Sequence, residues 1–123
     1  MPTHIPHWID GARREGGSGR TGDVTDSATG EVIGEVALAT TEEVDAAVAA
    51  ATAAFPRWRD TSLAKRTAVL FRFRELLNAR KPELAAIITA EHGKVLDDAL
   101  GEVSRGQEVV EFACGIPHLL KGD

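Results

Sequence analysis

The sequence has few of the residues that build covalent or metal-bound frameworks. Its 123 residues include one cysteine, one methionine and no tyrosine. A single cysteine excludes a disulfide bond within the chain, and it cannot form a zinc site without several other ligands. The four histidines, His4, His7, His92 and His118, show no metal-ligand spacing with Cys114. We therefore expect no metal site in this chain.

Long apolar runs are also missing. No run approaches the roughly 20 apolar residues that a membrane-spanning helix needs. The first six residues lack the charged, then apolar, then small-residue order of a secretory signal. These two features lead us to expect a cytoplasmic protein without a membrane partner.

Acidic residues outnumber basic residues. The chain has 14 lysines and arginines and 19 aspartates and glutamates, which give a net charge of −5. Eight of the basic residues gather between positions 57 and 81, but Glu75 and Glu83 lie among the last of them. An acidic total argues against a nucleic-acid partner. The basic cluster is better interpreted as a solvated helical face.

The first third of the chain has the pattern of short strands. Asp10-Gly11 is a favoured two-residue hairpin turn, and a glycine-rich loop follows it over residues 16–22. In the last predicted strand, Val32, Gly34, Val36 and Leu38 fall on one face. The pattern predicts a small antiparallel sheet with strands at residues 7–9, 12–14, 23–25 and 31–38.

Everything after Thr40 has helical periodicity. Thr40 and Glu43 have the spacing of a capping box at the start of the first helix. Pro56 is predicted to end that helix, which would leave Trp58 as a core anchor at the following turn.

Three further helices follow from capping signals. Ser62 can cap the second helix, and Pro82 suits the first turn of a third that Gly93 closes in a left-handed conformation. A fourth begins near Leu96 and carries Gly106, which we expect to permit close backbone approach. The predicted fold class is therefore α+β. A single segment, residues 1–123, would have a small antiparallel hairpin and sheet at about 7–38 and about four amphipathic helices at about 41–117.

Residues 17–22 match the G-x-G-x-x-G pattern of dinucleotide-binding loops. That pattern needs a strand before it and a helix opening at its last glycine, so that helix amides can receive the pyrophosphate. Here the next residues predict a strand and a turn, so we do not expect the loop to bind a nucleotide.

Cys114 is the only thiol that could act as a nucleophile. A reactive thiolate favours a helix N-terminus or a nearby cation, but Cys114 lies near the end of its predicted helix. His118 is four residues further on, and Pro117 interrupts the helix between them. Structural burial is the favoured interpretation, and a thiol enzyme that uses Cys114 with His118 is the least favoured hypothesis.

Other polar residues have simple structural explanations. His92, with Lys94 nearby, can complement the negative end of the third helix. Glu102, Glu108 and Glu111 share the fourth helix, but paired carboxylates also need a substrate cleft, which the sequence does not indicate. We assign no catalytic, cofactor-binding or metal-binding residue.

Six segments together resemble the N-terminal part of aldehyde dehydrogenases, from about His7 to Asp123. The last segment is similar to the CoA-acylating methylmalonate-semialdehyde branch of the family. The segments are His7-Trp8-Ile9-Asp10-Gly11, Ala28-Thr29-Gly30-Glu31-Val32, Glu43-Val44-Asp45-Ala46-Ala47-Val48, Phe55-Pro56-x-Trp58, Glu91-His92-Gly93-Lys94, and residues 109–122.

The resemblance implies an N-terminal fragment of a much longer subunit. That subunit would use NAD and coenzyme A to convert methylmalonate or malonate semialdehyde into propionyl-CoA or acetyl-CoA and CO₂, in valine and inositol catabolism. It would form a homo-oligomer, a tetramer in the family. The nucleotide-binding core, the catalytic residues and the oligomerisation hairpin have no matching positions here, so the resemblance implies an inactive chain. The alternative hypothesis is an interaction module that associates with itself or with a full-length subunit.

Overall fold

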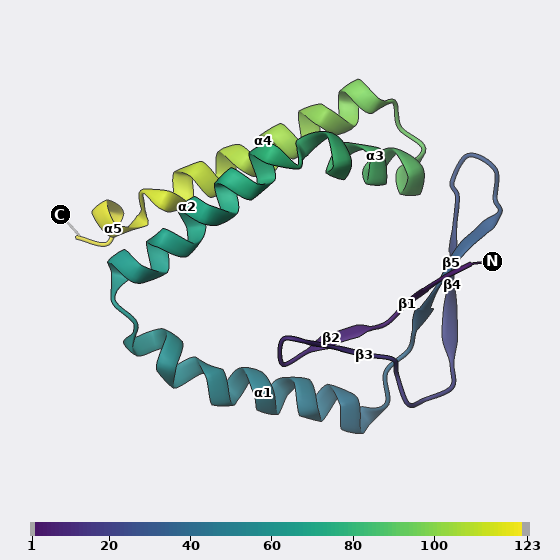
Figure 1. Ribbon diagram of the computed structural model, residues 1–123, viewed down its shortest axis with the longest axis horizontal. Coiled ribbons are helices and arrows are strands. Elements are labelled where there is room, and N and C mark those ends of the chain that lie inside the picture. The colour runs from purple at the N-terminus through teal and green to yellow at the C-terminus, as the bar shows by residue number, and fades with distance from the viewer. Residues whose placement is uncertain (1, 122–123) are drawn as a thin grey trace. The chain divides into compact units, whose positions relative to one another are not determined.

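The computed structural model describes residues 2–121, which divide into two compact units between Arg59 and Asp60. Figure 1 shows the strands and one helix of the first unit and the helices of the second. The strands are β1 (Thr3–Ile5), β2 (His7–Ile9), β3 (Ala12–Arg14), β4 (Thr21–Thr25) and β5 (Val32–Ala37). The helices are α1 (Thr41–Asp60), α2 (Leu63–Ala79), α3 (Lys81–His92), α4 (Leu96–Cys114) and α5 (Ile116–Leu119).

The predicted hairpin is confirmed. Strands β2 and β3 pair antiparallel, with Trp8 opposite Arg13. Asp10 and Gly11 form the two-residue turn, at φ 54° and 68°. Both values are positive, as a turn that matches the right-handed twist of the strands requires.

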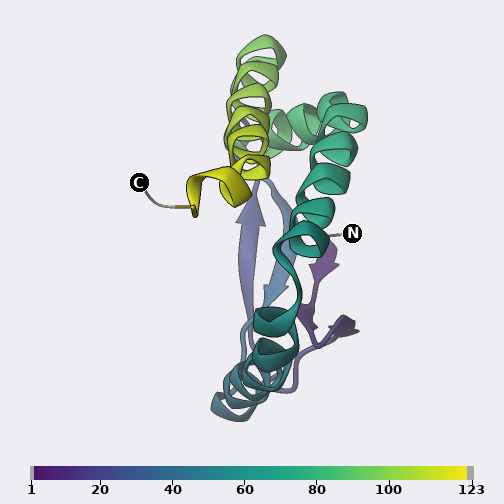
Figure 2. The same ribbon diagram turned by 90° about the vertical axis from the view of Figure 1, so that its left-hand side faces the viewer.

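A three-stranded sheet has the order β1-β5-β4. The antiparallel pairing of β4 and β5 confirms the predicted strands, and Figure 2 shows these two strands side by side. The sequence did not predict β1, which pairs with β5 in the parallel direction. Gly34 permits this pairing, because a Cβ there would lie 3.2 Å from the backbone oxygen of Thr3.

The predicted buried face of β5 is only partly right. Gly34 is buried, but Val32 and Leu38 are exposed, and the second buried residue of the strand is Ala37. The alternation is lost because β1 and β4 flank β5 only at its edges, and Ala37 is the one buried apolar side chain in the described part of this unit, so no layer of large side chains covers one face of the strand.

Helix α1 begins as predicted and ends later than predicted. The Thr40 N–H donates to Glu43 Oε2 at 2.9 Å, and the Glu43 N–H donates to Thr40 Oγ1 at 3.2 Å, so the capping box is confirmed. The prediction that Pro56 ends the helix is wrong, because α1 continues to Asp60. A proline removes one helical hydrogen bond, and the freed carbonyl lies on a fully exposed stretch where water can replace it.

Trp58 is consequently not a core anchor. It lies inside the last turns of α1 with 49% of its surface exposed. No residue of α1 is buried.

The helix ends of the second unit confirm four sequence predictions. The Lys65 N–H donates to Ser62 Oγ at the start of α2. Pro82 lies in the first turn of α3, and Gly93 ends that helix at φ 81°. Leu96 begins α4. The short helix α5 was not predicted as a separate element, and it follows Gly115 with Pro117 in its first turn.

The core of the second unit is built from small residues where α3 packs on α4. Ala85 and Ala99 are fully buried, and Val103 is nearly so. Small side chains allow two helices to approach closely, and α2 packs along α4 beside them (Figure 1).

Gly106 does not make the predicted close approach. A Cβ at this position would meet nothing within 4 Å. The buried stripe of α4 instead runs through Ala99, Val103, Gln107 and Cys114. Gly106 is seven residues after Ala99 and therefore lies near this stripe, but it is exposed and no atom of a neighbouring helix lies within 4 Å of its Cβ position.

Candidate functional site

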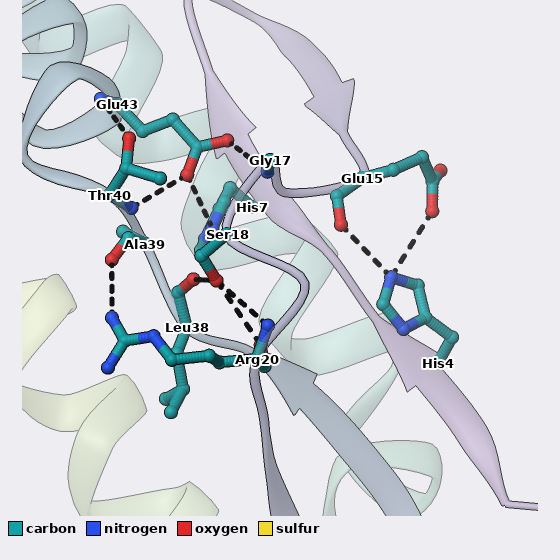
Figure 3. Close-up of polar contacts among 10 residues, drawn as sticks. All are labelled: His4, His7, Glu15, Gly17, Ser18, Arg20, Leu38, Ala39, Thr40 and Glu43. Atoms are coloured by element: carbon teal, nitrogen blue, oxygen red, sulfur yellow. Dashed lines mark hydrogen bonds and ion pairs between the residues drawn. The ribbon is translucent and has the colours of Figure 1, made fainter.

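A polar cluster of the first unit surrounds the carboxylate of Glu43 (Figure 3). Glu43 Oε1 accepts a hydrogen bond from the Gly17 N–H at 2.7 Å, and Oε2 accepts the capping-box bond from Thr40. The Glu43 side chain therefore caps the N-terminus of α1 and also binds the glycine-rich loop, 26 residues earlier in the chain.

His7 faces the same carboxylate. Its Nε2 lies 3.9 Å from Glu43 Oε2 and is buried without a hydrogen-bond partner among the described residues. The backbone N–H groups of Thr40 and Gly17, and then the charge of His7, hold the pKa of Glu43 below its usual value. Glu43 is therefore an ionised anchor rather than a proton donor near neutral pH.

The glycine-rich loop binds back onto its own unit. The Ser18 hydroxyl donates to the Leu38 carbonyl oxygen and accepts the Arg20 N–H, while the Leu38 N–H donates to the Arg20 carbonyl oxygen (Figure 3). Strand β4 begins at Thr21, which confirms that a strand follows the loop. Because no helix opens at Gly22, the loop lacks the helix N-terminus that would receive a pyrophosphate.

A small hollow of 310 Å³ lies beside the Glu43 cluster. Its charged lining consists of Asp10, Arg14 and Glu43, and Ile9, Ala46 and Ala50 provide apolar walls. These groups can bind charge, but the lining contains no cysteine, serine, threonine or lysine that could act as a thiol, hydroxyl or amine nucleophile. Within residues 2–121, no three side chains of histidine, cysteine, aspartate or glutamate come together as a metal site.

The structure separates Cys114 from His118. Cys114 is buried at the last position of α4, as predicted, whereas His118 is exposed in α5. Gly115 breaks the helix between them, and the His118 N–H donates to the Gly115 carbonyl oxygen. No hydrogen bond or ion pair in the described part of the chain joins the thiol to the imidazole.

The three candidate glutamates do not form a carboxylate pair. Glu111 binds Arg74 of α2 at 2.6 Å, and Glu102 binds Lys94 at 2.5 Å. Arg74, and then Gln107, hold the pKa of Glu111 below its usual value, and Lys94 does the same for Glu102. Glu108 is exposed. The sequence did not indicate the pairing of Arg74 with Glu111, because the two are 37 residues apart.

His92 has the predicted position in the last turn of α3, directly before Gly93. Its charge also lowers the pKa of Glu102, after the larger effect of Lys94. The basic residues of this turn therefore stabilise a helix end and an acidic neighbour. In the described part of the chain, no helix is both long and apolar enough to span a membrane.

The sequence also matches known proteins. The profile of the aldehyde dehydrogenase family matches residues 14–123. A malonate-semialdehyde dehydrogenase of Pseudomonas aeruginosa is 48% identical over 106 residues, which are 86% of this chain and 21% of the relative. The mitochondrial acylating methylmalonate-semialdehyde dehydrogenase of Arabidopsis thaliana is 45% identical over the whole chain, which covers 20% of the relative.

The fold has a close structural counterpart. A protein from Sinorhizobium meliloti, crystallised with NAD and named for methylmalonate-semialdehyde dehydrogenase activity, superposes with a TM-score of 0.94 at 47% identity. The superposition covers all of this chain and 25% of that one. The chain thus spans between a fifth and a quarter of the length of the relatives it matches.

Proposed function

The chain belongs to the aldehyde dehydrogenase family, and from this premise we propose that it forms part of an NAD-dependent, CoA-acylating enzyme. The complete enzyme would convert methylmalonate or malonate semialdehyde and coenzyme A into propionyl-CoA or acetyl-CoA and CO₂. The observation that carries the proposal is 45–48% identity to relatives named for these two semialdehydes. Cytoplasmic location, homo-oligomeric assembly and a place in valine or inositol catabolism belong to the same proposal.

This chain contributes structure rather than chemistry to that enzyme. Its one thiol, Cys114, is buried at the C-terminal end of α4, away from solvent and from the helix N-terminus where reactive cysteines are found. The Glu43 carboxylate is occupied by backbone N–H groups. We therefore assign no catalytic or cofactor-binding residue to the chain, and we expect it to be inactive alone.

A chimaera tests the enzyme assignment. In the P. aeruginosa relative, this chain replaces the aligned 106 residues. CoA-dependent NADH formation from malonate semialdehyde should remain within about tenfold of the parent enzyme, because a well-matched scaffold leaves the reacting groups in place. A folded, oligomeric chimaera without activity would contradict the assignment.

A second assay tests inactivity of the chain alone. Purified chain, mixed with methylmalonate semialdehyde, NAD and coenzyme A, should form no NADH. NADH formation by the wild type that is abolished in Cys114→Ala would overturn this expectation.

The second candidate function is an interaction module. Val44, Val48 and Phe55 of α1 expose more than half of their surface, and Val109 and Phe112 of α4 expose about 70%. Exposed apolar faces of this kind mark association surfaces. Sedimentation should then show self-association or binding to a full-length subunit. A strictly monomeric chain that binds neither the subunit nor 1-anilinonaphthalene-8-sulfonate would remove this candidate.

A further inference from the structure

The imidazole of His7 carries a ring nitrogen that is buried without a hydrogen bond. Only 19% of the side chain is exposed, and Nε2 has no hydrogen-bond partner among the described residues. A buried polar atom in this state is unfavourable, and such atoms are rare in native proteins. The nearest carboxylate is that of Glu43, whose Oε2 lies 3.9 Å from Nε2 (Figure 3).

This distance fits an ion pair that has not closed into a hydrogen bond. A nitrogen donor and an oxygen acceptor need a separation of about 2.7–3.2 Å. A neutral imidazole at 3.9 Å therefore gains little from Glu43. An imidazolium is attracted by the carboxylate, and a movement of about 1 Å would give a charge-assisted hydrogen bond, which is stronger than a neutral one.

The Glu43 carboxylate can accept this additional bond. Its two oxygens each accept one backbone N–H, from Gly17 and from Thr40. A carboxylate oxygen has two lone pairs, so Oε2 keeps one acceptor site. The N–H groups of Thr40 and then of Gly17 hold the pKa of Glu43 below its usual value. The carboxylate therefore remains charged over the range in which histidines titrate.

Two sides of the imidazole are formed by groups without charge. A Cβ at Gly16 of the loop would lie 3.4 Å from His7 Nε2 and 2.9 Å from the Cβ of Ala37 in β5. The loop and the end of β5 therefore confine the ring. Glu15, the acidic residue before Gly16, is paired with His4 at 3.3 Å.

The hairpin contributes charges of both signs. Arg14 of β3 lies opposite His7 in the strand register, and it lines the same hollow as Asp10 and Glu43. Arg14 opposes a second positive charge on His7, whereas Asp10 and Glu43 favour it. Glu43 is the carboxylate within 4.0 Å of the His7 ring, so it is the partner that an imidazolium would bind.

We propose that His7 is a pH-dependent latch, which on protonation binds Glu43 Oε2 and thereby joins the β2–β3 hairpin to the glycine-rich loop and the start of α1. Glu43 already connects the loop to the helix. The latch adds the hairpin as a third element held by the same carboxylate.

The sign of the pH dependence follows from the charged form that binds. The latch is closed when the imidazole is protonated, and it opens as the pH rises through the range of about 5 to 8 in which histidines titrate. At lower pH it opens again, because Glu43 loses its charge below its usual pKa of 4.5. The hairpin should therefore be held most firmly at about pH 5 to 6.

Hydrogen exchange of the complete 123-residue chain tests the latch. Protection factors of the β2 and β3 amides should rise about threefold to tenfold as the pH falls from about 8 to about 5.5. His7→Gln keeps an N–H donor but cannot become charged, so its protection factors should change less than about twofold over this range. A wild-type pH dependence in His7→Gln overturns the proposal.

His4→Gln is the matched control. His4 also faces a carboxylate, that of Glu15, but it lies on the exposed strand β1. This variant should keep the wild-type rise in hairpin protection. An equal loss of the rise in His4→Gln and His7→Gln overturns the latch, because the effect would then not be specific to the contact with Glu43.

A second measurement needs no substitution and holds even if His7→Gln fails to fold. In ¹⁵N-labelled wild-type chain at about pH 5.5, the Nε2 proton of His7 should exchange slowly with water, because it is bonded to Glu43. At about pH 8 this slowly exchanging signal should be lost. The absence of the signal at the lower pH, or its persistence at the higher pH, overturns the proposal.

Discussion

The two units of the chain are stabilised in different ways. In the first, backbone pairing and the hydrogen bonds of Glu43 hold short strands and a loop together, and Ala37 is its one buried apolar side chain among the described residues. In the second, helices pack through Ala85, Ala99 and Val103. The first unit should therefore respond most to the loss of specific hydrogen bonds, and the second to changes in side-chain volume or polarity.

The largest effect should come from a charge in the helical core. Ala85 is fully buried, and its neighbour Ala86 is exposed. Ala85→Asp should destabilise the second unit by about 4 kcal/mol, because a buried carboxylate would lack a partner. Urea unfolding followed by far-ultraviolet circular dichroism measures the change.

Ala86→Asp is the matched control and should cost less than about 1 kcal/mol, because its carboxylate remains in water. Amide signals of β4 and β5 should not change in either variant. Equal destabilisation by the two substitutions would contradict the assigned core.

In the first unit the corresponding change is Glu43→Gln. The amide can supply only one acceptor oxygen in place of the two carboxylate oxygens that bind Gly17 and Thr40. Hydrogen exchange of the Gly17 amide should accelerate about tenfold. Glu42→Gln, which removes the same charge one residue earlier, should leave that exchange rate within about twofold. Unchanged exchange in Glu43→Gln would refute the role of the carboxylate.

Lowering the pH should break the same contact between the Glu43 carboxylate and the Gly17 amide. Because the folded-state pKa of Glu43 is below 4.5, the carboxylate stabilises the loop fully above pH 4.5 and loses this effect as the pH falls through the folded value. The protection factor of the Gly17 amide should therefore decrease below pH 4.5 in the wild type. In Glu43→Gln it should remain low and nearly constant. A wild-type protection factor that rises on acidification would be the opposite result.

Alanine substitutions at two glycines of the second unit should have smaller effects on stability, of opposite sign. Gly93 ends α3 at φ 81°, where a Cβ is strained, so Gly93→Ala should destabilise by about 1 kcal/mol. Gly101 lies inside α4 with open space around it. Gly101→Ala should stabilise by up to about 1 kcal/mol, because alanine favours the helix. Urea titration measures both changes, and effects of the same sign would contradict this distinction.

The smallest effect should come from the exposed ion pair between α2 and α4. Arg74→Gln should lower the unfolding temperature by less than about 2 °C, and the difference should shrink as salt rises from about 0.1 to 1 M. Arg72→Gln on the same helix is the control. A salt-independent loss would show that Arg74 acts through packing instead.

Local signals predicted most of the fold. The turn at Asp10-Gly11, the capping box at Thr40, the cap at Ser62 and the left-handed Gly93 each act within a few residues, so the sequence alone encodes them. The family resemblance also came from such local segments, and the match to residues 14–123 confirms it.

Contacts between distant residues were not predictable in this way. The pairing of β1 with β5, the bond from Gly17 to Glu43 and the ion pair of Arg74 with Glu111 join residues that are 26 to 37 positions apart. The continuation of α1 through Pro56 depends on the exposure of its last turns, which no short pattern encodes.

The positions of the aromatic side chains give each unit its own optical signal. Both tryptophans of the chain, Trp8 and Trp58, lie in the first unit with 73% and 49% of their surface exposed, and the sequence contains no tyrosine. Indole emission therefore arises only from residues 2–59, and we expect its maximum in the folded protein near that of a hydrated indole. Melting of α2 to α5 would be nearly invisible to fluorescence, although it would remove much of the ellipticity at 222 nm.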